Sequence, residues 1–215
     1  MEQIKFTSKL KSEVCKDWLS YIPGLSKYKT SILFNKIGPL LVGVSFKYSG
    51  LQRMYTPIYS VHNLTRDFNS ISCTLCLNAD IVKIENYKET FKKRADFLKN
   101  HAYIPMEGDL NLEQIISGYE KFFEESDTDC ITECEDLILL CGWCKNKEKL
   151  EYCLNLVKNK LKKLDEVYFC DEGGFDNWYN DLKVRASDGD KLRQICDEQI
   201  KSLKLEKIAI RELIY

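Results

Sequence analysis

Four cysteines occupy one side of a single expected helix, and two of them form a motif that could do redox or metal chemistry. They are spaced by four, seven and three residues, at Cys130, Cys134, Cys141 and Cys144. Residues three and four apart lie on the same side of a helix, so this spacing is typical of a buried helical face. Taken alone, the segment Cys141-Gly142-Trp143-Cys144 would instead indicate a redox centre or a pair of metal ligands.

The place of Cys141 and Cys144 within their helix argues against redox chemistry. Redox pairs of this spacing stand at a helix N-terminus, where the helix dipole lowers the thiol pKa. Here the pair comes late in the helix expected over 130–146, where the dipole has the opposite sign. No strand leads into the motif. Because free cysteine packs as a small hydrophobic residue, we interpret the cysteine stripe as core.

A structural zinc ion would need a second cysteine pair, and Cys73 with Cys76 is the only close candidate. These two residues fall in an expected strand, where a spacing of three places the side chains on opposite faces. Neither this pair nor Cys141 with Cys144 has the Gly- or Pro-rich knuckle that turns two thiolates toward one ion. We therefore expect no metal and no cofactor.

His62 is the centre of a second set of residues that could do chemistry. It ends an expected strand and is followed by Asp67, and two further carboxylates, Asp171 and Asp176, flank the loop at Gly173–Gly174. Histidine and carboxylates serve as general acids and bases, so a hydrolase or nuclease built from these residues is one hypothesis. The simpler interpretation is a hydrogen-bonded histidine at a strand end and a loop that starts a helix.

Two acidic segments are the strongest indication of a partner. Residues 124–136 hold seven acids and no base, whereas residues 145–163 hold seven lysines against two acids. Acids near a helix start and lysines near a helix end complement the helix dipole, but the acid density exceeds what that role needs. We expect these acids to bind a partner with a basic surface: Glu124, Glu125, Asp127, Asp129, Glu133, Asp171, Glu172, Asp176 and Asp181.

Composition and short motifs limit the other classes of function. The net charge of −1 gives no general reason to expect binding to nucleic acid or to an anionic membrane. The longest apolar run, 137–144, is far shorter than a membrane span, and Met1–Lys5 has no apolar core of a secretory signal. We therefore expect a cytoplasmic protein with reduced cysteines. Phosphate-binding loops, His-Glu-x-x-His and Gly-x-Ser-x-Gly motifs are absent.

Hydrophobic periodicity predicts the elements of the first half. An amphipathic helix is expected over 3–22, where apolar residues recur every four positions up to Pro23-Gly24. Strands are expected at 31–35, 40–48, 56–64 and 71–78, the first two joined as a hairpin. In the second strand Val42, Val44 and Phe46 share one face by alternation. In the fourth strand we expect these side chains to point inward: Ile71, Cys73, Leu75 and Leu77.

From residue 86 the helical period takes over. Helices are expected at 86–101, 111–125, 130–146, 147–164, 175–185 and 189–203. The third and fourth of these should form an antiparallel hairpin, and capping boxes are expected at Asn111 with Gln114 and at Thr132 with Glu135. Short strands are expected at 167–170 and 205–214.

These elements predict one α+β domain over 1–215. An N-terminal helix and a small antiparallel sheet fill 1–85, and a mostly helical layer with a closing strand fills 86–215. With no catalytic signature, the leading hypothesis is a non-enzymatic protein-binding protein. A bacterial immunity protein that inhibits a toxin, or a defence-associated protein, would have this chemistry, because such inhibitors bind basic partners by charge complementarity.

Overall fold

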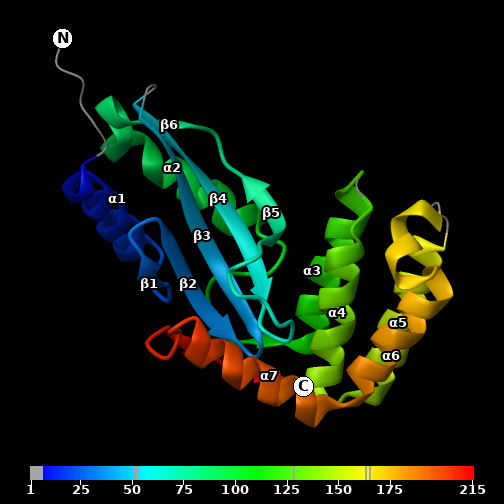
Figure 1. Ribbon diagram of the computed structural model, residues 1–215. Coiled ribbons are helices and arrows are strands. Elements are labelled where there is room, and N and C mark those ends of the chain that lie inside the picture. Colours follow the sequence, from blue (N-terminus) through cyan, green and yellow to red (C-terminus); the bar gives the residue numbers. More distant parts are fainter. Residues whose placement is uncertain (1–6, 51–52, 128, 163, 165) are drawn as a thin grey trace.

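An N-terminal helix, a largely antiparallel sheet and a helical second half make up the chain (Figure 1), as the periodicity predicts. The computed structural model describes residues 7–50, 53–127, 129–162, 164 and 166–215, without the side chains of Glu166, Val167 and Glu172. The part of the expected first helix at residues 3–6 lies outside these residues. Among the described residues, no helix has both the length and the apolar character needed to cross a lipid bilayer.

The elements follow one another in this order. The first half contains α1 (Ser8–Tyr21), β1 (Ser26–Lys29), β2 (Ile32–Ile37), β3 (Leu40–Ser49), β4 (Met54–Asn63), β5 (Thr74–Asn78) and β6 (Val82–Lys83). A short 3-10 turn, η1 (Ile84–Asn86), leads into the second half. That half contains α2 (Tyr87–His101), β7 (Leu110–Asn111), α3 (Leu112–Glu125), α4 (Ile131–Cys144), α5 (Lys147–Leu161), η2 (Glu166–Glu172), α6 (Phe175–Ser187), α7 (Gly189–Ser202), β8 (Ile210–Arg211) and β9 (Leu213–Ile214).

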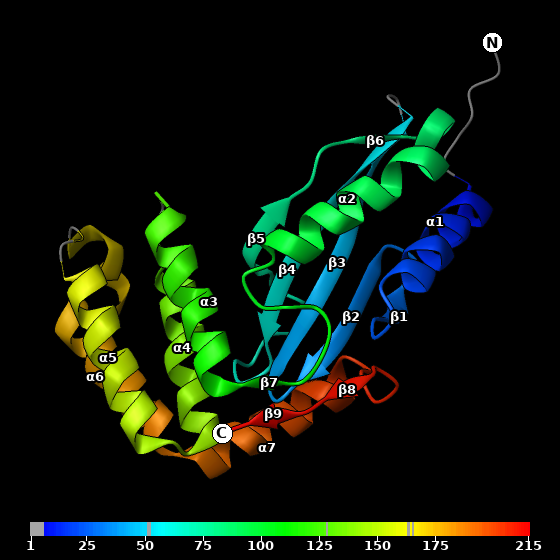
Figure 2. The ribbon, with the colours of Figure 1, turned by 180° about the vertical axis from the view of Figure 1, so that it is seen from behind.

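The sheet places helices on both of its faces. Its strands lie in the order β1-β2-β3-β4-β5, and each neighbouring pair is antiparallel. Gly38, with a φ of +53°, makes the tight β2–β3 turn as expected, because positive φ suits glycine. Side chains then alternate along β3: Val42 and Val44 pack with α1 and α2, whereas Leu41 packs with α7 on the opposite face (Figure 2).

Helix α4 is the centre of the helical half. It contacts α3, α5, α6, α7 and β5, and it runs antiparallel to α5, which confirms the expected helical hairpin (Figure 1). All four cysteines of the stripe are buried, and the Sγ of Cys141 lies 3.6 Å from that of Cys153 in α5. Burial raises the pKa of the Cys144 thiol to about 12. The stripe is therefore packed apolar surface with little thiolate.

Thiol reactivity should follow this burial. Of the ten free cysteines, Cys73, Cys76 and Cys170 are exposed and the others are buried. We expect a disulfide exchange reagent to modify three thiols of the native protein rapidly, and all ten only after denaturation. Cys76 should react more slowly than Cys73, because partial burial raises its pKa to about 11. Rapid modification of Cys141 or Cys144 in the native protein would contradict this packing.

Three expectations about local structure are wrong. The first is the inward alternation expected for 71–78. Leu75 in β5 has a φ of +47°, which breaks this alternation, so that Thr74 and Leu75 are both buried and Cys73 is exposed. The expected strand at 167–170 is the 3-10 turn η2, because no described strand lies beside it to pair with it. The expected closing strand is split: β8 pairs with β2 and β9 with β7, both in parallel.

The two expected capping boxes have different outcomes. Asn111 and Gln114 form the reciprocal box at the start of α3, as predicted. Helix α4 instead begins after Cys130, whose φ of +54° and lack of a side-chain cap rule out a box at Thr132 and Glu135. The Glu135 carboxylate turns to Arg185 and Arg66 instead, at 2.7 and 3.6 Å.

Candidate functional site

A buried ion pair joins the end of β4 to the middle of α4. Asp136 is fully buried on α4, and its Oδ1 lies 2.9 Å from the Nε of Arg66, in the loop after β4. Its Oδ2 accepts a hydrogen bond of 2.9 Å from the Thr74 hydroxyl of β5. Asp136 therefore ties three separate segments together and is not part of the acidic surface.

Further hydrogen bonds hold the loop between β4 and β5. Asn63 donates to the Asp136 carbonyl oxygen at 2.9 Å and accepts from the amide and the hydroxyl of Thr65. At the other side of the loop, Gln199 of α7 donates to Asp67 at 2.9 Å. The neutral amide of Gln199 therefore binds Asp67, and no described interaction joins Asp67 to His62. The loop is positioned by α4 and α7 together.

Burial changes the acidity of Asp136 more than its partners do. Removal from water raises the pKa of this carboxyl to about 7, while the Arg66 charge and the Thr74 hydrogen bond act to lower it. A carboxyl with such a pKa could serve as a general acid or base. Asp136 has no exposed surface, however, so a substrate cannot reach it. The arrangement is therefore structural, and we call Asp136 with Arg66, Thr74 and Asn63 the bracket, because these residues fix the β4–β5 loop to α4.

His62 is a buried strand-end residue, as the simpler interpretation predicts. Its side chain has no exposed surface, and its Nδ1 lies 2.8 Å from the Ser72 carbonyl oxygen and 3.1 Å from the Ser72 amide nitrogen. Burial, with a smaller contribution from the nearby Arg66 charge, lowers the pKa of His62. The imidazole is therefore kept neutral and away from solvent.

Replacing His62 with glutamine should change how stability depends on pH. The folded pKa of His62 is lowered, so the unfolded chain takes up its proton first, and the histidine costs stability as pH falls below about 6.5. His62→Gln removes that loss, which amounts to as much as about 1.4 kcal/mol per pH unit. Urea unfolding at about pH 7.5 and about pH 5.5 measures it. A stability difference between wild type and variant that is the same at both pH values would contradict this account.

An open cavity lies in front of this bracket. It has a volume of about 390 Å³ and lies between the end of the β4–β5 loop and the start of α4. Ser72 and Thr74 form one wall, and Asp129 and Glu133 carry carboxylates on the other. Cys73, Cys130, Ile131 and Thr132 complete the lining, and the two carboxylates are hydrogen-bond acceptors for a cationic side chain.

The two acidic segments come together at one end of the helical half. Figure 1 and Figure 2 show that α3 and α5 end there, and that α4 and α6 begin there, opposite the end occupied by α7. The segment at Glu124–Glu133 and the loop that carries Asp171 and Asp176 thus face the same side of the molecule. We call the set Glu124, Asp127, Asp129, Glu133, Asp171 and Asp176 the acidic end.

Most carboxylates of the acidic end have no ion-pair partner among the described residues. Glu125 and Asp181 belong to the expected set but are paired, at 3.9 Å with Lys121 and at 3.6 Å with Arg185. Lysines at the end of α5 lie close by, and one of them, Lys160, donates to the carbonyl oxygen of Phe123. The side chain of Glu172 lies outside the described residues. The acidic end therefore has carboxylates without a described ion pair beside the lysines in the last turn of α5.

The residues of the hydrolase hypothesis are not brought together. His62 is buried at the end of β4, whereas Asp171 and Asp176 are exposed in η2 and at the start of α6. In both views α4 stands between the sheet and these two acids (Figures 1 and 2). No described interaction or cavity joins them to His62. The cysteine pairs are separated as well, since Cys76 lies near Glu133 and Cys141 lies on the last turns of α4.

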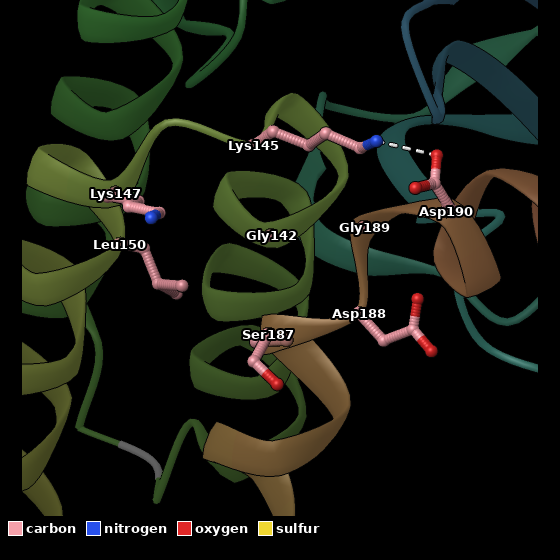
Figure 3. Close-up of a pocket in the computed structure, with 9 residues that line it drawn as sticks. Gly142, Lys145, Lys147, Leu150, Ser187, Asp188, Gly189 and Asp190 are labelled. Atoms are coloured by element: carbon pink, nitrogen blue, oxygen red, sulfur yellow. Dashed lines mark hydrogen bonds and ion pairs between the residues drawn. The ribbon is translucent and has the colours of Figure 1, made fainter.

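A second cavity, of about 310 Å³, lies where the α4–α5 and α6–α7 connections meet (Figure 3). Lys145 and Asp190 form an ion pair across one side of it, and Asp188 caps α7 by accepting from the Lys191 amide. Lys145, Asp188 and Asp190 are thus engaged in local structure, and we assign this cavity no ligand.

Sequence reasoning did not identify Arg66, Ser72, Thr74 and Asp136 as residues of this region. Asp136 is the last of the seven acids within 124–136, and it directly follows Glu135, so nothing in the local sequence distinguishes it from the others. Comparison with models of protein families, with curated proteins and with solved structures finds no match to this chain.

Proposed function

We propose that this chain is a non-enzymatic protein-binding protein whose acidic end binds a partner with a basic surface. The observation that carries the proposal is the convergence of two acidic segments, about 40 residues apart, on one end of the helical half, with most of their carboxylates unpaired among the described residues. Like charges held together repel one another, and an approaching basic surface would relieve that repulsion.

The cavity beside the acidic end suggests how such a partner is anchored. Asp129 and Glu133 stand at its edge, and Ser72 and Thr74 form its wall. A lysine or arginine side chain of the partner would find the carboxylates of Asp129 and Glu133 as acceptors there. The bracket around Asp136 holds this wall in place, so the binding surface is preformed.

The ten free cysteines fit a reducing compartment, and we propose the cytoplasm. A neutralising protein that covers the basic substrate site of a nucleic-acid-degrading toxin, as an immunity protein does, is the kind of role this chemistry suits. A defence-associated regulator with a basic partner would use the same surface.

Capture of partners from the native host tests the proposal. The tagged wild-type protein should retain a stoichiometric protein with a basic surface. The variant with Glu124→Gln, Asp127→Asn and Asp129→Asn should retain at least about tenfold less of it, since rim charges change association strongly. Failure of the wild type to retain any stoichiometric protein would overturn the proposal.

A matched control separates the acidic end from net charge. Three exposed glutamates elsewhere can be neutralised together: Glu148→Gln, Glu198→Gln and Glu206→Gln. This control has the same net charge as the triple variant and should retain the partner as the wild type does. Equal loss of the partner in both variants would show that the surface responsible is not the acidic end.

A further inference from the structure

A cavity with the opposite charge character lies at the other end of α4. It has a volume of about 480 Å³ and is enclosed by the last turn of α4, by α7, by the β2–β3 turn and by the C-terminal strands β8 and β9. Figure 2 shows these strands running beside α7, close to the C-terminus. Because α4 has 14 residues and is about 20 Å long, this cavity is remote from the acidic end.

Arg193 is held rigidly at the wall of this cavity. Its guanidinium lies over the Trp143 ring, 5.2 Å from the centroid, and its Nε donates to the Trp143 carbonyl oxygen at 3.1 Å. Its Nη2 donates to the Tyr215 hydroxyl at 3.1 Å. Among the described residues Nη1 has no hydrogen-bond partner. A guanidinium fixed in this way binds an anion with little loss of side-chain entropy.

Lys36 supplies a second positive charge. It lines the same cavity, and its ammonium group has no hydrogen bond or ion pair with the part of the chain that the structure describes. Arg211 also lines the cavity, but its guanidinium donates to the carbonyl oxygens of Pro105, Glu107 and Gly108 and is not available. Asp197 is the one acidic side chain among the described lining residues, so Lys36 and Arg193 outnumber it.

Apolar and aromatic side chains complete the wall. The rings of Trp143 and Tyr215 are 5.8 Å apart in an edge-to-face arrangement. Tyr215 is 52% exposed and Ile210 is 71% exposed. A flat apolar group lying against them would remove this surface from water.

We propose that this cavity binds a small phosphate monoester with an aromatic body. Lys36 and Arg193 contact the phosphate as cationic hydrogen-bond donors. The aromatic body lies against Trp143, Tyr215 and Ile210. None of these residues belongs to the acidic end. Phosphate binding at this cavity can therefore be tested independently of the proposed protein-binding function.

Calorimetric titration with phenyl phosphate tests the proposal, with inorganic phosphate and phenol as separate probes of the charge and of the ring. Phenyl phosphate should bind one site with a Kd below about 1 mM, and at least about tenfold more tightly than either fragment. Absence of saturable binding, or binding of phenyl phosphate no tighter than inorganic phosphate, would overturn the proposal.

Charge-neutral variants locate the site. Lys36→Gln and Arg193→Gln should each weaken phenyl phosphate binding by at least about tenfold. Lys191→Gln is the matched control, because Lys191 is an exposed cation of α7 that does not line the cavity, and it should bind as the wild type does. Arg193→Gln also loses packing on Trp143, so Lys36→Gln decides the matter if Arg193→Gln unfolds. Binding by Lys36→Gln equal to that of the control contradicts the assignment.

Discussion

Replacing Arg66 with methionine should lower the free energy of unfolding by about 3–5 kcal/mol at alkaline pH. The change removes the charge that lies 2.9 Å from the fully buried Asp136 and leaves a carboxylate without its partner inside the protein. Urea unfolding measures the loss. Lys121→Met is the control, because Lys121 pairs with Glu125 at 3.9 Å with both side chains exposed, and this pair should contribute less than about 1 kcal/mol.

The loss in Arg66→Met should shrink as pH falls. The pKa of Asp136 is raised to about 7 in the folded protein against about 3.9 in the unfolded chain. Protonation of Asp136 therefore favours the folded state fully below about pH 4, and this contribution is lost as pH rises through about 7. Without Arg66 the pKa of Asp136 in the folded protein is higher still. The difference in free energy of unfolding between wild type and Arg66→Met therefore grows as pH rises. A pH-independent loss would contradict a charge origin.

Removing both charges distinguishes the contribution of the ion pair to stability from that of packing. Arg66→Met with Asp136→Leu replaces the pair by apolar side chains of similar size, and such replacements are often neutral. The double variant should therefore recover most of the stability that Arg66→Met loses. If the double variant is less stable than Arg66→Met, the hydrogen bond from Thr74 to Asp136 outweighs the ion pair.

Replacing Gly142 with alanine should destabilise the protein by about 2–3 kcal/mol. A Cβ at Gly142 would lie 2.3 Å from the carbonyl oxygen of Ala186, which is backbone of α6 and cannot rotate away. The two helices must separate, and forcing extra atoms into a packed interface costs about this much. Alanine favours a helix over glycine by about 1 kcal/mol, which offsets part of the loss.

Thermal and urea unfolding of Gly142→Ala measure the effect of this close contact. Gly50→Ala is the control, because nothing lies within 4 Å of a Cβ built there, and it should change stability by less than about 0.5 kcal/mol. Separation of α4 from α6 should also make Cys144 react with thiol reagents. A variant as stable as the wild type would show that the helices do not approach each other as described.

Local patterns in the sequence predict most of the elements. The cysteine spacing predicts the buried side of α4, and alternation in β3 predicts the face that packs with α1 and α2. These predictions succeed because the period of a helix or strand alone determines which of its side chains share a face. The alternation expected for 71–78 fails at Cys73, which is exposed, because the positive φ of Leu75 interrupts the regular strand geometry that alternation requires.

The candidate site could be predicted only in part. Each acidic segment is evident from the sequence, but their convergence depends on the directions in which α3 to α6 run (Figure 1). Asp136 cannot be distinguished from its acidic neighbours by local sequence, because Arg66 is 70 positions away along the chain. The alternative role of His62 as an acid or base required Asp171 and Asp176, which the fold places elsewhere.

Carbodiimide cross-linking in an extract of the native host, followed by peptide mass spectrometry, tests the binding account most directly, because this reagent joins carboxylates only to amines in contact with them. The account predicts that peptides containing Glu124–Glu133 or Asp171–Asp176 are joined to lysines of one partner protein. These products should disappear at high salt, where exposed charges are screened. Cross-links from a reproducible partner that map only to carboxylates outside the acidic end would contradict the account.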